Sequence, residues 1–329
     1  MVATFPDSRF DASPDAPGRP SVLYLGGLGR SGTTLLERVL GQLPGACSVG
    51  ELVHLWRRGV LDDETCGCGQ PFSGCPFWST VGRLAFGGWD PDLAVRMEDL
   101  RSRVDRTRYV PRLMAPRLLN RARSAELREY AEVWLRLHQG ISEASGGAVV
   151  IDSSKHSSLA FVLRAQPGID LRVVHVVRDS RGVAYSWTKE VHRPEAGAGA
   201  LMTRYSPTRS AALWLGHNVL FGLLGRLGVT THLLRYEDFV EAPAQVVGEL
   251  ARFAGLAADG SSVVDGSTVV LSPSHTVAGN PMRFRVGPLA LRRDDAWRGQ
   301  LPRGHRWLVG ALTAPLLARY GYLRQERSA

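Results

Sequence analysis

The chain has 329 residues, of which 44% are hydrophobic and 22% are charged, so it has the composition of an ordinary globular protein. This length predicts either one large domain or one domain that carries a sizeable insertion. The formal net charge of +9 and the isoelectric point near 9.9 favour an anionic ligand or partner, although a scattered basic surface would have the same composition. Neither a lysine-rich tail nor zinc-finger spacing is present, which argues against a nucleic-acid-binding module.

Residues 1–20 contain four prolines, three aspartates and little apolar material. We expect a flexible leader there, neither a signal peptide nor a transit peptide, followed by a single domain over residues 21–329. The longest apolar runs, 211–225 and 308–318, are too short to span a bilayer. The sequence therefore predicts a cytoplasmic protein with no membrane span, and its four cysteines are expected to be thiols and not a disulfide framework.

Residues 22–40 have the pattern of a strand, a glycine-rich turn and the start of a helix. Residues 22–25 are apolar, glycines follow at positions 26, 27, 29 and 32, and apolar residues at helical spacing resume after Thr33. Such a turn directs backbone N–H groups and a helix N-terminus at one point. It predicts an anion-binding site, most often for a phosphate.

The side chains of this turn favour one kind of phosphate ligand over another. An NTP-binding loop has the pattern GxxxxGK[ST], and Gly27 and Gly32 have its spacing, but Thr33 stands where the lysine that reaches the β and γ phosphates should be. Arg30, inside the turn, supplies a permanent bidentate cation next to the bound group. The turn therefore suits a short 5′ anion better than a triphosphate.

The segment RSGTTLL, residues 30–36, resembles the 5′-phosphosulfate loop of sulfotransferases that use 3′-phosphoadenosine 5′-phosphosulfate (PAPS). Arginine at position 30 is similar to tyrosylprotein sulfotransferases and many bacterial members, whereas cytosolic members have lysine there. A generic phosphate loop for another ligand would show the same seven residues. The resemblance implies that the 5′ end of the cofactor is bound by Gly29, Arg30, Ser31, Gly32, Thr33 and Thr34.

Glu51 follows a turn at residues 43–45 and has two interpretations. An acidic residue that opens a helix is stabilised there by the helix macrodipole. In the tyrosylprotein sulfotransferases a glutamate at the same distance from the loop arginine acts as general base, so the resemblance implies that role for Glu51. Transfer of a sulfuryl group to a hydroxyl needs a base within hydrogen-bond reach of the attacking O–H.

Cys66, Cys68 and Cys75 form a C-x-C-x6-C array that ends in CPFW. Three thiols can hold zinc with Cys47 or His54 as a fourth ligand, but C-x-C is not the usual two-residue spacing of a zinc knuckle. The patch resembles a recurring feature of bacterial PAPS-dependent sulfotransferases. We interpret it as structural, and metal binding is the less favoured alternative.

Residues 82–147 are charged and helical in pattern, and Pro111 and Pro116 divide them into separate helices. We expect a helical insertion that shapes the acceptor site, although a helical brace fits the same pattern. Further helices are predicted over residues 210–227 and 307–322.

A buried strand is predicted to lead into a polar turn at residues 152–155. Asp152 at the end of its hydrophobic run imitates the Walker B position of a P-loop kinase or NTPase, where it would bind Mg²⁺. The resemblance instead matches Lys155 with a lysine that the tyrosylprotein family uses to stabilise the sulfuryl group and the bridging oxygen. A solvated lysine in a turn is the alternative.

A second strand of the predicted parallel sheet ends at Arg178. Arg178 and Ser186, eight residues apart, match the arginine and serine that bind the 3′-phosphate of PAPS across the superfamily. A dianionic phosphate suits a guanidinium fork and a hydroxyl donor, while an ion pair of Arg178 with Asp152 or Asp179 is the alternative. His175, within the strand, is predicted to be a hydrogen-bonded core residue.

Two later segments complete the expected nucleotide site. Tyr236 lies in a YED segment that resembles one in which a tyrosine contacts the adenosine, and a strand-to-helix turn capped by acidic residues is the alternative. Residues 272–287 resemble the late loop that closes the nucleotide site, though the RKG pattern of cytosolic enzymes is absent. We expect that this loop contributes Ser274, Asn280, Arg283 and Arg285.

These patterns predict an α/β, P-loop-like three-layer fold with a mainly parallel central sheet and ligands at the carboxyl ends of its strands. The resemblance implies transfer of a sulfuryl group from PAPS to a hydroxyl or amine of a small-molecule acceptor, releasing adenosine 3′,5′-bisphosphate. Glu51 would take the acceptor proton, Arg30 and Lys155 would stabilise the leaving group, and no metal is needed. The alternatives are a P-loop kinase or NTPase that uses ATP and Mg²⁺, and a non-catalytic PAPS-binding protein.

Overall fold

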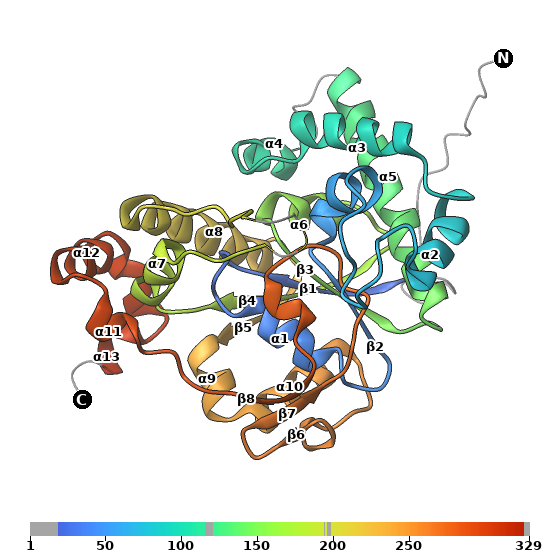
Figure 1. Cartoon of the computed structure of the whole chain (residues 1–329). Coiled ribbons are helices and arrows are strands. Elements are labelled where there is room, and N and C mark those ends of the chain that lie inside the picture. The colour runs from blue at the N-terminus through green and yellow to red at the C-terminus, as the bar shows by residue number, and fades with distance from the viewer. Residues whose placement is uncertain (1–18, 116–120, 194, 196–198, 326–329) are drawn as a thin grey trace.

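The computed structural model describes residues 19–115, 121–193, 195 and 199–325 (Figure 1). The predicted leader therefore lies almost wholly outside the described residues, and so does Pro116. Within the described part of the chain, no helix is both long enough and apolar enough to cross a membrane.

A five-stranded sheet forms the centre of the molecule, with the strand order β2-β3-β1-β4-β5. Every neighbouring pair of its strands is parallel, which confirms the predicted α/β fold class. Parallel neighbours need crossover connections, and helices supply them here. The strands are β1 (Ser21–Gly26), β2 (Ala46–Gly50), β3 (Val149–Lys155), β4 (Asp170–Val177) and β5 (Thr230–Arg235).

Alternate side chains of the central strand β1 enter two different hydrophobic cores, as the two-residue period of a strand requires. Val22 and Tyr24 of β1 pack with α6 (Ser157–Arg164) and α8 (Pro207–Arg226). Leu23 and Leu25 pack on the opposite face with the remaining layer of helices. That layer consists of α1 (Thr33–Leu40), α9 (Tyr236–Glu241) and α10 (Pro243–Ala254), so the sheet lies between two helical layers (Figure 1).

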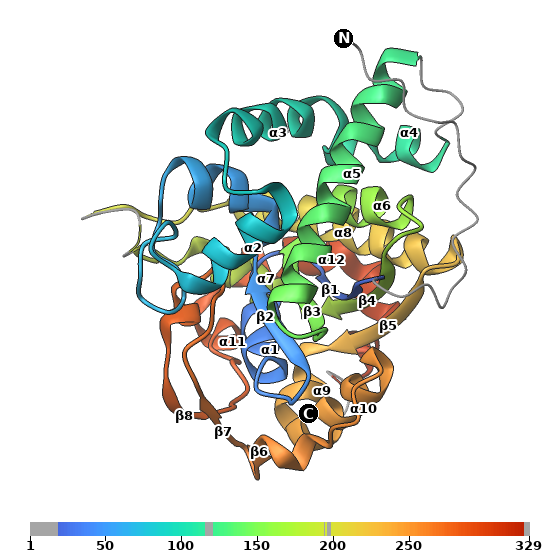
Figure 2. The ribbon, with the colours of Figure 1, turned by 90° about the vertical axis from the view of Figure 1, so that its right-hand side faces the viewer.

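The described residues of the stretch 82–147 are largely helical and pack on the α6 and α8 side of the sheet. Figure 2 shows α3 and α5 on that side, and Met97 and Trp134 belong to the same core as Val150 of β3. Pro111 lies in the first turn of a short helix, where a missing N–H costs nothing. The four helices are α2 (Pro76–Phe86), α3 (Pro91–Val104), α4 (Val110–Met114) and α5 (Arg121–Ala144).

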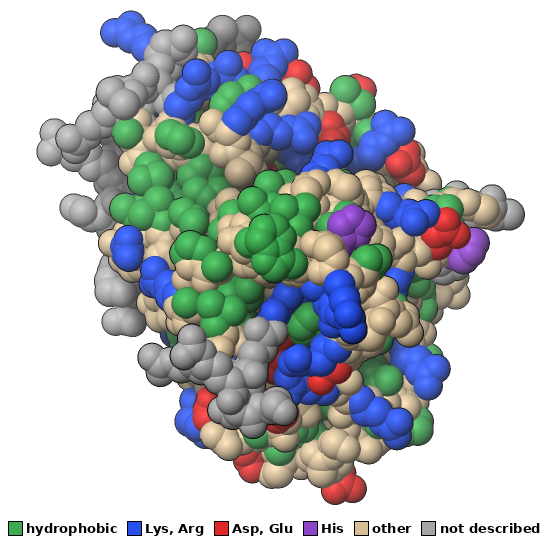
Figure 3. Space-filling model, turned by 90° about the vertical axis from the view of Figure 1, so that its left-hand side faces the viewer, with side chains coloured by type: hydrophobic (Ala, Val, Ile, Leu, Met, Phe, Trp, Pro, Cys, Tyr) green, Lys and Arg blue, Asp and Glu red, His purple; other side chains and the backbone are tan. Residues whose placement is uncertain are grey.

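The C-terminal elements lie at one end of the sheet, to the left in Figure 1. The predicted closing helix is α12 (Arg303–Arg319), whose Val309 packs with Ala184 of α7 (Ser180–Thr188). The short helices α11 (Trp297–Gln300) and α13 (Tyr322–Gln325) precede and follow it in the chain. Figure 3 shows apolar side chains gathered on this face, where Trp307 of α12 is 74% exposed.

A small antiparallel sheet below the main one was not predicted from the sequence. It contains β6 (Val264–Asp265), β7 (Thr268–Leu271) and β8 (Gly287–Ala290) in that order. The segment between β7 and β8 is the late loop of the sequence analysis. It leaves the small sheet, reaches the central sheet beside β2, and returns.

Candidate functional site

The carboxyl ends of β1, β3 and β4 open into a cavity of about 570 Å³. β1 lies between β3 and β4, so the crossover connections of β1 and its neighbours leave in opposite directions at this point. Such a switch point is where open α/β sheets bind ligands. Of the described residues that line the cavity, one is acidic, Glu51, and five are basic: Arg30, Arg58, Lys155, Arg178 and Arg193.

The turn between β1 and α1 needs glycine at two positions. A Cβ on Gly27 would lie 2.4 Å from the carbonyl oxygen of Val176, and Gly27 has a φ of 141°. Gly32 has a φ of 90°, and a Cβ there would lie 2.3 Å from the ring of Tyr236. Gly32 is also the N-cap of α1 and offers no capping side chain. The N–H groups of the first turn are therefore available to a bound anion.

Arg30 supplies a fixed cation in this turn. Its guanidinium lies 5.2 Å from the ring centroid of Trp187, and its Nη2 donates to Met202 Sδ at 3.3 Å. Trp187 is itself held by a hydrogen bond from Nε1 to the carbonyl oxygen of Gly29. Burial lowers the pKa of Arg30 despite the opposing charge of Glu51, yet a guanidinium stays charged at neutral pH. Its Nε is buried with no hydrogen-bond partner among the described residues, which leaves a donor for a ligand.

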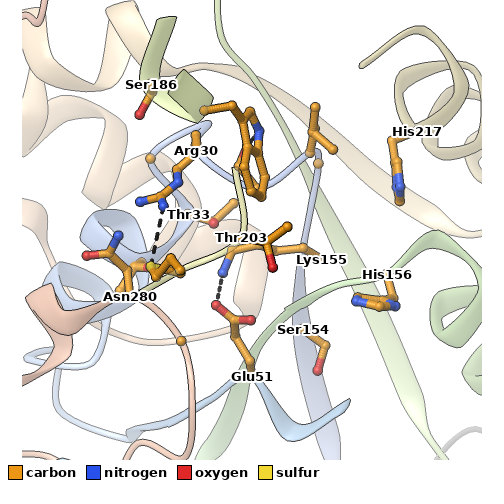
Figure 4. A pocket seen from close by; sticks show the side chains of 18 of the residues that line it. Arg30, Thr33, Glu51, Ser154, Lys155, His156, Ser186, Thr203, His217 and Asn280 are labelled. Carbon is orange, nitrogen blue, oxygen red and sulfur yellow. Dashed lines mark hydrogen bonds and ion pairs between the residues drawn. The ribbon is translucent and has the colours of Figure 1, made fainter. Parts of the chain in front are cut away.

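Glu51 and Lys155 meet at the floor of the cavity. The Lys155 ammonium donates to Glu51 Oε1, and both side chains are nearly buried, at 11% and 15% exposed. Figure 4 shows the two side chains turned toward each other, with Arg30 on one side and His156 on the other. Glu51 follows β2 and Lys155 ends β3, so neighbouring strands of the sheet bring the pair together.

A buried carboxylate on α1 fixes the backbone on which these two residues stand. Glu37 accepts hydrogen bonds from the backbone N–H of Gly50 at 2.5 Å, from Ser48 Oγ at 3.0 Å and from Ser153 Oγ at 2.6 Å. Burial raises the pKa of Glu37, while these hydrogen bonds act in the opposite direction. Glu37 thus connects α1 to β2 and β3 directly beside Glu51.

Asp152, the Walker B candidate, does not line the cavity. Its side chain is fully buried and accepts from the backbone N–H of Ser154 at 2.8 Å and from Ser154 Oγ at 2.5 Å. Ser154 Oγ in turn accepts from the N–H of Val53, just after Glu51. Burial raises the pKa of Asp152 to about 7. Asp152 therefore organises the loop after β2, and it is not placed to hold Mg²⁺ against a ligand in the cavity.

Arg178, at the end of β4, provides a second cationic position. Its Nη2 donates to Asp294 Oδ2 at 3.0 Å and to the Asp294 carbonyl at 3.1 Å, and its guanidinium lies 4.7 Å from the ring centroid of Tyr236. Burial disfavours the charged form of Asp294, but the hydrogen bond and charge of Arg178 outweigh it and lower the pKa of Asp294. Ser186, in the last turn of α7, lines the same cavity. The ion pair that the structure shows for Arg178 is with Asp294, and not with Asp152 or Asp179, which were the alternatives from the sequence.

Most of the predicted site residues line this one cavity, although they come from six separate segments of the chain. Ser31 is fully buried beneath the turn and does not line it. The residues that do are Gly29, Arg30, Gly32, Thr33, Thr34, Glu51, Lys155, Arg178, Ser186, Tyr236 and Asn280.

Three residues of the late loop lie outside the cavity, which corrects their expected role. Arg283 is buried and donates to the carbonyl oxygens of Thr276 at 2.7 Å and Thr65 at 2.6 Å, so its guanidinium holds backbone in place. Ser274 Oγ bonds to Thr276 Oγ1. Arg285 is exposed. The alternation of Arg283 and Arg285 expected for an extended segment fails because residues 281–284 form a turn of 3₁₀-helix.

Three histidines that were not expected at the site line the cavity: His54, His156 and His217. Burial lowers the pKa of His54 and of His156 well below the ordinary value, and lowers that of His217 to about 4. His54 Nε2 lies 3.7 Å from Glu51 Oε2, and because this imidazole is neutral the contact is not an ion pair. Figure 4 shows His156 and His217 on the side of Lys155 away from Ser186. His217 interrupts an apolar helical run, which was the available signal.

The cavity is completed by two segments without a catalytic signature. Leu201, Met202, Thr203 and Tyr205 line it from the segment before α8. Within the expected insertion, Thr107 is the described residue that does so. Most described residues of this stretch therefore lie outside the cavity.

Solved structures that resemble this chain include a sulfotransferase domain from the olefin synthase of Synechococcus PCC 7002, with 20% identity, a TM-score of 0.45, and coverage of 90% of this chain and 94% of that one. The sulfotransferase domain of the curacin biosynthetic pathway has 15% identity, a TM-score of 0.48, and coverage of 90% and 97%. A sulfotransferase from Mycobacterium avium has 15% identity, a TM-score of 0.40, and coverage of 74% and 65%. All three are sulfotransferases.

Neither a family model nor a curated protein matches the sequence. All three solved structures have an identity to this chain of 20% or less and a TM-score below 0.5.

Proposed function

We propose that the chain is a PAPS-dependent sulfotransferase that moves a sulfuryl group to a hydroxyl of a small-molecule acceptor. The observation that carries this proposal is the presence of two separate anion-binding positions in one cavity with a carboxylate–ammonium pair beside them. One position is the turn that contains Arg30, and the other is Arg178 with Ser186. A nucleotide with a 5′-phosphosulfate and a 3′-phosphate has its anions at two such points.

The residues present fit this cosubstrate. The turn offers the N–H groups of α1 and the unpartnered Nε of Arg30 to the 5′ group. At the second position, the carboxylate of Asp294 forms an ion pair with the guanidinium of Arg178. An aspartate held there shows that this guanidinium binds an oxyanion, and we propose that the 3′-phosphate replaces it. Tyr236, beneath Arg178, offers an aromatic face near the nucleotide.

The proposed chemistry is an in-line displacement at sulfur. The acceptor oxygen forms a bond to sulfur while the bond from sulfur to the bridging phosphate oxygen breaks, and adenosine 3′,5′-bisphosphate leaves. Glu51 accepts the proton of the acceptor hydroxyl. Arg30, Lys155 and the N–H groups of the turn stabilise the negative charge that develops on the bridging oxygen. Lys155 must exchange its contact with Glu51 for the leaving group when the cosubstrate binds.

The acceptor side of the cavity favours a neutral alcohol or phenol. His54, His156 and His217 are all kept neutral by burial, so they can donate or accept hydrogen bonds without adding charge. Leu201 and Leu213 add apolar lining. We therefore place the acceptor hydroxyl between Glu51 and this group of histidines.

The kinase alternative finds less support in the site. It needs a lysine in the turn, where Thr33 stands, and a carboxylate free to bind Mg²⁺. Asp152 is buried and bonded to Ser154. Titration calorimetry with adenosine 3′,5′-bisphosphate and with ATP and Mg²⁺ separates the two: we expect binding of the bisphosphate, and binding of ATP alone would overturn the proposal.

The catalytic assignment is tested with Glu51→Gln. We expect unchanged affinity for the bisphosphate and a fall in PAPS turnover of about 10²-fold or more, measured with a panel of phenols, sugars and aliphatic alcohols. Glu132→Gln on the exposed surface of α5 is the matched control and should keep both properties. Turnover that survives Glu51→Gln would remove Glu51 from the mechanism, and binding without turnover of any acceptor by the unmodified chain would favour a non-catalytic PAPS-binding protein.

A further inference from the structure

Three cysteines and one histidine come together outside the cavity. The ligand atoms of Cys66, Cys68, Cys75 and His275 all lie within 4.8 Å of one another. Cys68 Sγ is 3.7 Å from Cys75 Sγ, and Cys75 Sγ is 3.2 Å from His275 Nδ1. All of the chain's cysteines are free thiols in the structure.

These separations match a tetrahedral zinc site. Zinc binds thiolate sulfur at about 2.3 Å and imidazole nitrogen at about 2.0–2.1 Å, which places tetrahedral ligands about 3.8 Å apart for two sulfurs and about 3.6 Å apart for sulfur and nitrogen. The Cys68–Cys75 and Cys75–His275 separations lie within about 0.4 Å of these values. Small rotations of the side chains would close the remaining gaps around an ion.

We propose that Cys66, Cys68, Cys75 and His275 bind a structural zinc ion. Three thiolates and an imidazole are the donors that zinc prefers, and hard cations such as Mg²⁺ and Ca²⁺ prefer oxygen. The protein fills all four positions of a tetrahedron, so no position is left for a substrate or a reactive water. The histidine that completes the set is His275, whereas the sequence suggested Cys47 or His54.

The backbone is built to present the first two thiols. Thr65 and Pro71 pair as an antiparallel bridge, Cys66 N–H donates to the Gln70 carbonyl at 2.8 Å, and Gly69 N–H donates to the Cys66 carbonyl at 2.9 Å. This tight hairpin turns Cys66 and Cys68 toward the same point, and it accommodates the short C-x-C spacing that differs from a usual knuckle.

The hairpin is joined directly to the segment that carries His275. Gly67 N–H donates to the Thr276 carbonyl at 2.9 Å. A Cβ on Gly67 would lie 2.4 Å from Thr276 Oγ1, so only glycine allows this approach. Arg283 bridges the same two segments through the carbonyl oxygens of Thr276 and Thr65.

Residues around the cluster orient its histidine, as the outer shell of a metal site does. Trp78 Nε1 donates to the His275 carbonyl at 2.8 Å. The ring of Phe77 stacks on the His275 ring, with 5.0 Å between centroids and 14° between planes. Both aromatic residues follow directly after Cys75 and Pro76, which explains the CPFW sequence in terms of the site.

The site has a consequence for the cavity because the His275 segment runs on into it. Val277 pairs with β2 by donating to the Val49 carbonyl at 2.8 Å and accepting from the Glu51 N–H at 2.9 Å. Gly279 and Asn280 then line the cavity, and a Cβ on Gly279 would lie 3.0 Å from Glu51 Oε1. Zinc would therefore fix the segment that positions the backbone of Glu51.

Metal analysis of the full-length protein tests the proposal, and it does not depend on PAPS. The protein is expressed without a polyhistidine tag and purified under reducing conditions. We expect one zinc ion per chain by elemental mass spectrometry. We also expect that cobalt added to the zinc-stripped chain gives thiolate charge-transfer absorption and tetrahedral d–d bands. A reduced wild-type chain that holds no zinc and gives no such cobalt spectrum would overturn the proposal, as would a disulfide between Cys68 and Cys75 in freshly purified protein.

Variants assign the ligands. Cys75→Ser should lower bound zinc by about tenfold or more, whereas His275→Cys keeps four suitable donors and should retain it. Cys47→Ser on β2 lies outside the cluster and is the matched control, with zinc unchanged. Loss of zinc in the Cys47→Ser protein, or full zinc in Cys75→Ser, would contradict the assignment. If Cys75→Ser fails to fold, the cobalt spectrum of the wild-type chain still shows whether the metal has thiolate ligands in a tetrahedral arrangement.

Hydrogen exchange tests the positioning role. Removal of zinc should raise amide exchange over residues 275–280 and at Glu51, while exchange in β4 stays unchanged. Equal exchange with and without zinc over residues 275–280 would show that the ion does not hold this segment. If the chain binds the bisphosphate but no zinc, the proposed function stands and only the zinc proposal is wrong. If the chain binds zinc but not the bisphosphate, the zinc proposal stands and the proposed function is wrong.

Discussion

Arg30 and Lys155 have backbone conformations that residues other than glycine seldom adopt. Their φ angles are 74° and 66°, in the left-handed region. Such a conformation costs about 1–3 kcal/mol and persists where the surroundings fix it, often at functional sites. Here the surroundings are Trp187 for Arg30 and Glu51 for Lys155. The strain turns both cations into the cavity.

Arg178 allows the sharpest test of the nucleotide position at the residue scale. Arg178→Met should weaken binding of adenosine 3′,5′-bisphosphate by about 10- to 100-fold, because a buried charge-assisted hydrogen bond contributes about 1.5–3 kcal/mol. Binding of adenosine 5′-monophosphate, which has no 3′-phosphate, should change much less. Calorimetry with both ligands measures the difference.

The exposed Arg226 of α8 provides the control, since Arg226→Met removes the same charge away from the cavity. It should leave both affinities unchanged. Equal weakening of the two ligands by Arg178→Met would place the 3′-phosphate elsewhere.

At the scale of elements, the site depends on where the β1–α1 turn and the late loop meet the sheet. The turn follows directly from β1, so its geometry is local. The late loop reaches the site by pairing Val277 with β2, after leaving an antiparallel sheet on the far side of α1. The conformation of the β1–α1 turn therefore depends on its own sequence, whereas the position of the late loop depends on its pairing with β2.

Gly32→Ala tests the turn. Gly32 has a φ of 90°, and a Cβ there would overlap the ring of Tyr236 at 2.3 Å. We expect a fall in the free energy of unfolding of at least about 1–2 kcal/mol, measured by denaturant titration, because an alanine is strained in this conformation and the ring must also move.

Gly222→Ala in the middle of α8 is the matched control. A Cβ at Gly222 meets no atom within 4 Å, and alanine favours a helix over glycine by about 0.8–1.0 kcal/mol, so this variant should be as stable as the wild type or more so. Equal stability of Gly32→Ala and the wild type would show that the turn is not fixed as the structure has it.

For the whole molecule, buried histidines make stability depend on pH. Burial lowers the pKa of His138, His175 and His217 to about 4, below the ordinary value near 6.5. Between about pH 4 and about pH 6.5, the unfolded chain therefore binds more protons at these histidines than the folded chain does. Each histidine lowers the free energy of unfolding by about 1.4 kcal/mol per pH unit as the pH falls from about 6.5 to about 4.

Asp152 acts in the opposite direction over an overlapping range. Burial raises its pKa to about 7, so its folded form holds a proton that the unfolded chain has lost above about pH 4. Its contribution to the free energy of unfolding falls as the pH rises from about 4 to about 7. This change is roughly equal in size and opposite in sign to the change from one buried histidine. Burial also raises the pKa of Glu37, Asp105 and Glu237, which act in the same direction as Asp152. The histidines by themselves make the protein lose stability on acidification below about pH 6.5.

His175→Gln tests this dependence on one residue. His175 Nε2 lies 2.8 Å from Asn218 Oδ1, and a glutamine amide can replace that contact without titrating. The pH slope of the free energy of unfolding below about pH 6.5 should decrease by about 1.4 kcal/mol per pH unit. His305→Gln, at an exposed position of α12, should leave the slope unchanged. An unaltered slope in His175→Gln would mean that His175 is already protonated in the folded chain.

The sequence by itself determined the structural features whose residues are consecutive in the chain. The strand, turn and helix of residues 21–40 and the strand that ends at Arg178 follow from apolar runs and glycines, because the backbone conformation of such units depends on neighbours in the chain. These patterns predicted the parallel sheet, and most of the site residues that they suggested line the cavity.

Tertiary structure decided the features that join distant segments. Arg283 was expected at the cofactor, but its partners are the carbonyl oxygens of Thr65 and Thr276. His275 completes the cysteine cluster about 200 residues further along the chain. No local pattern encodes such contacts, because they arise only when the order of strands in the sheet brings β2 beside the late loop.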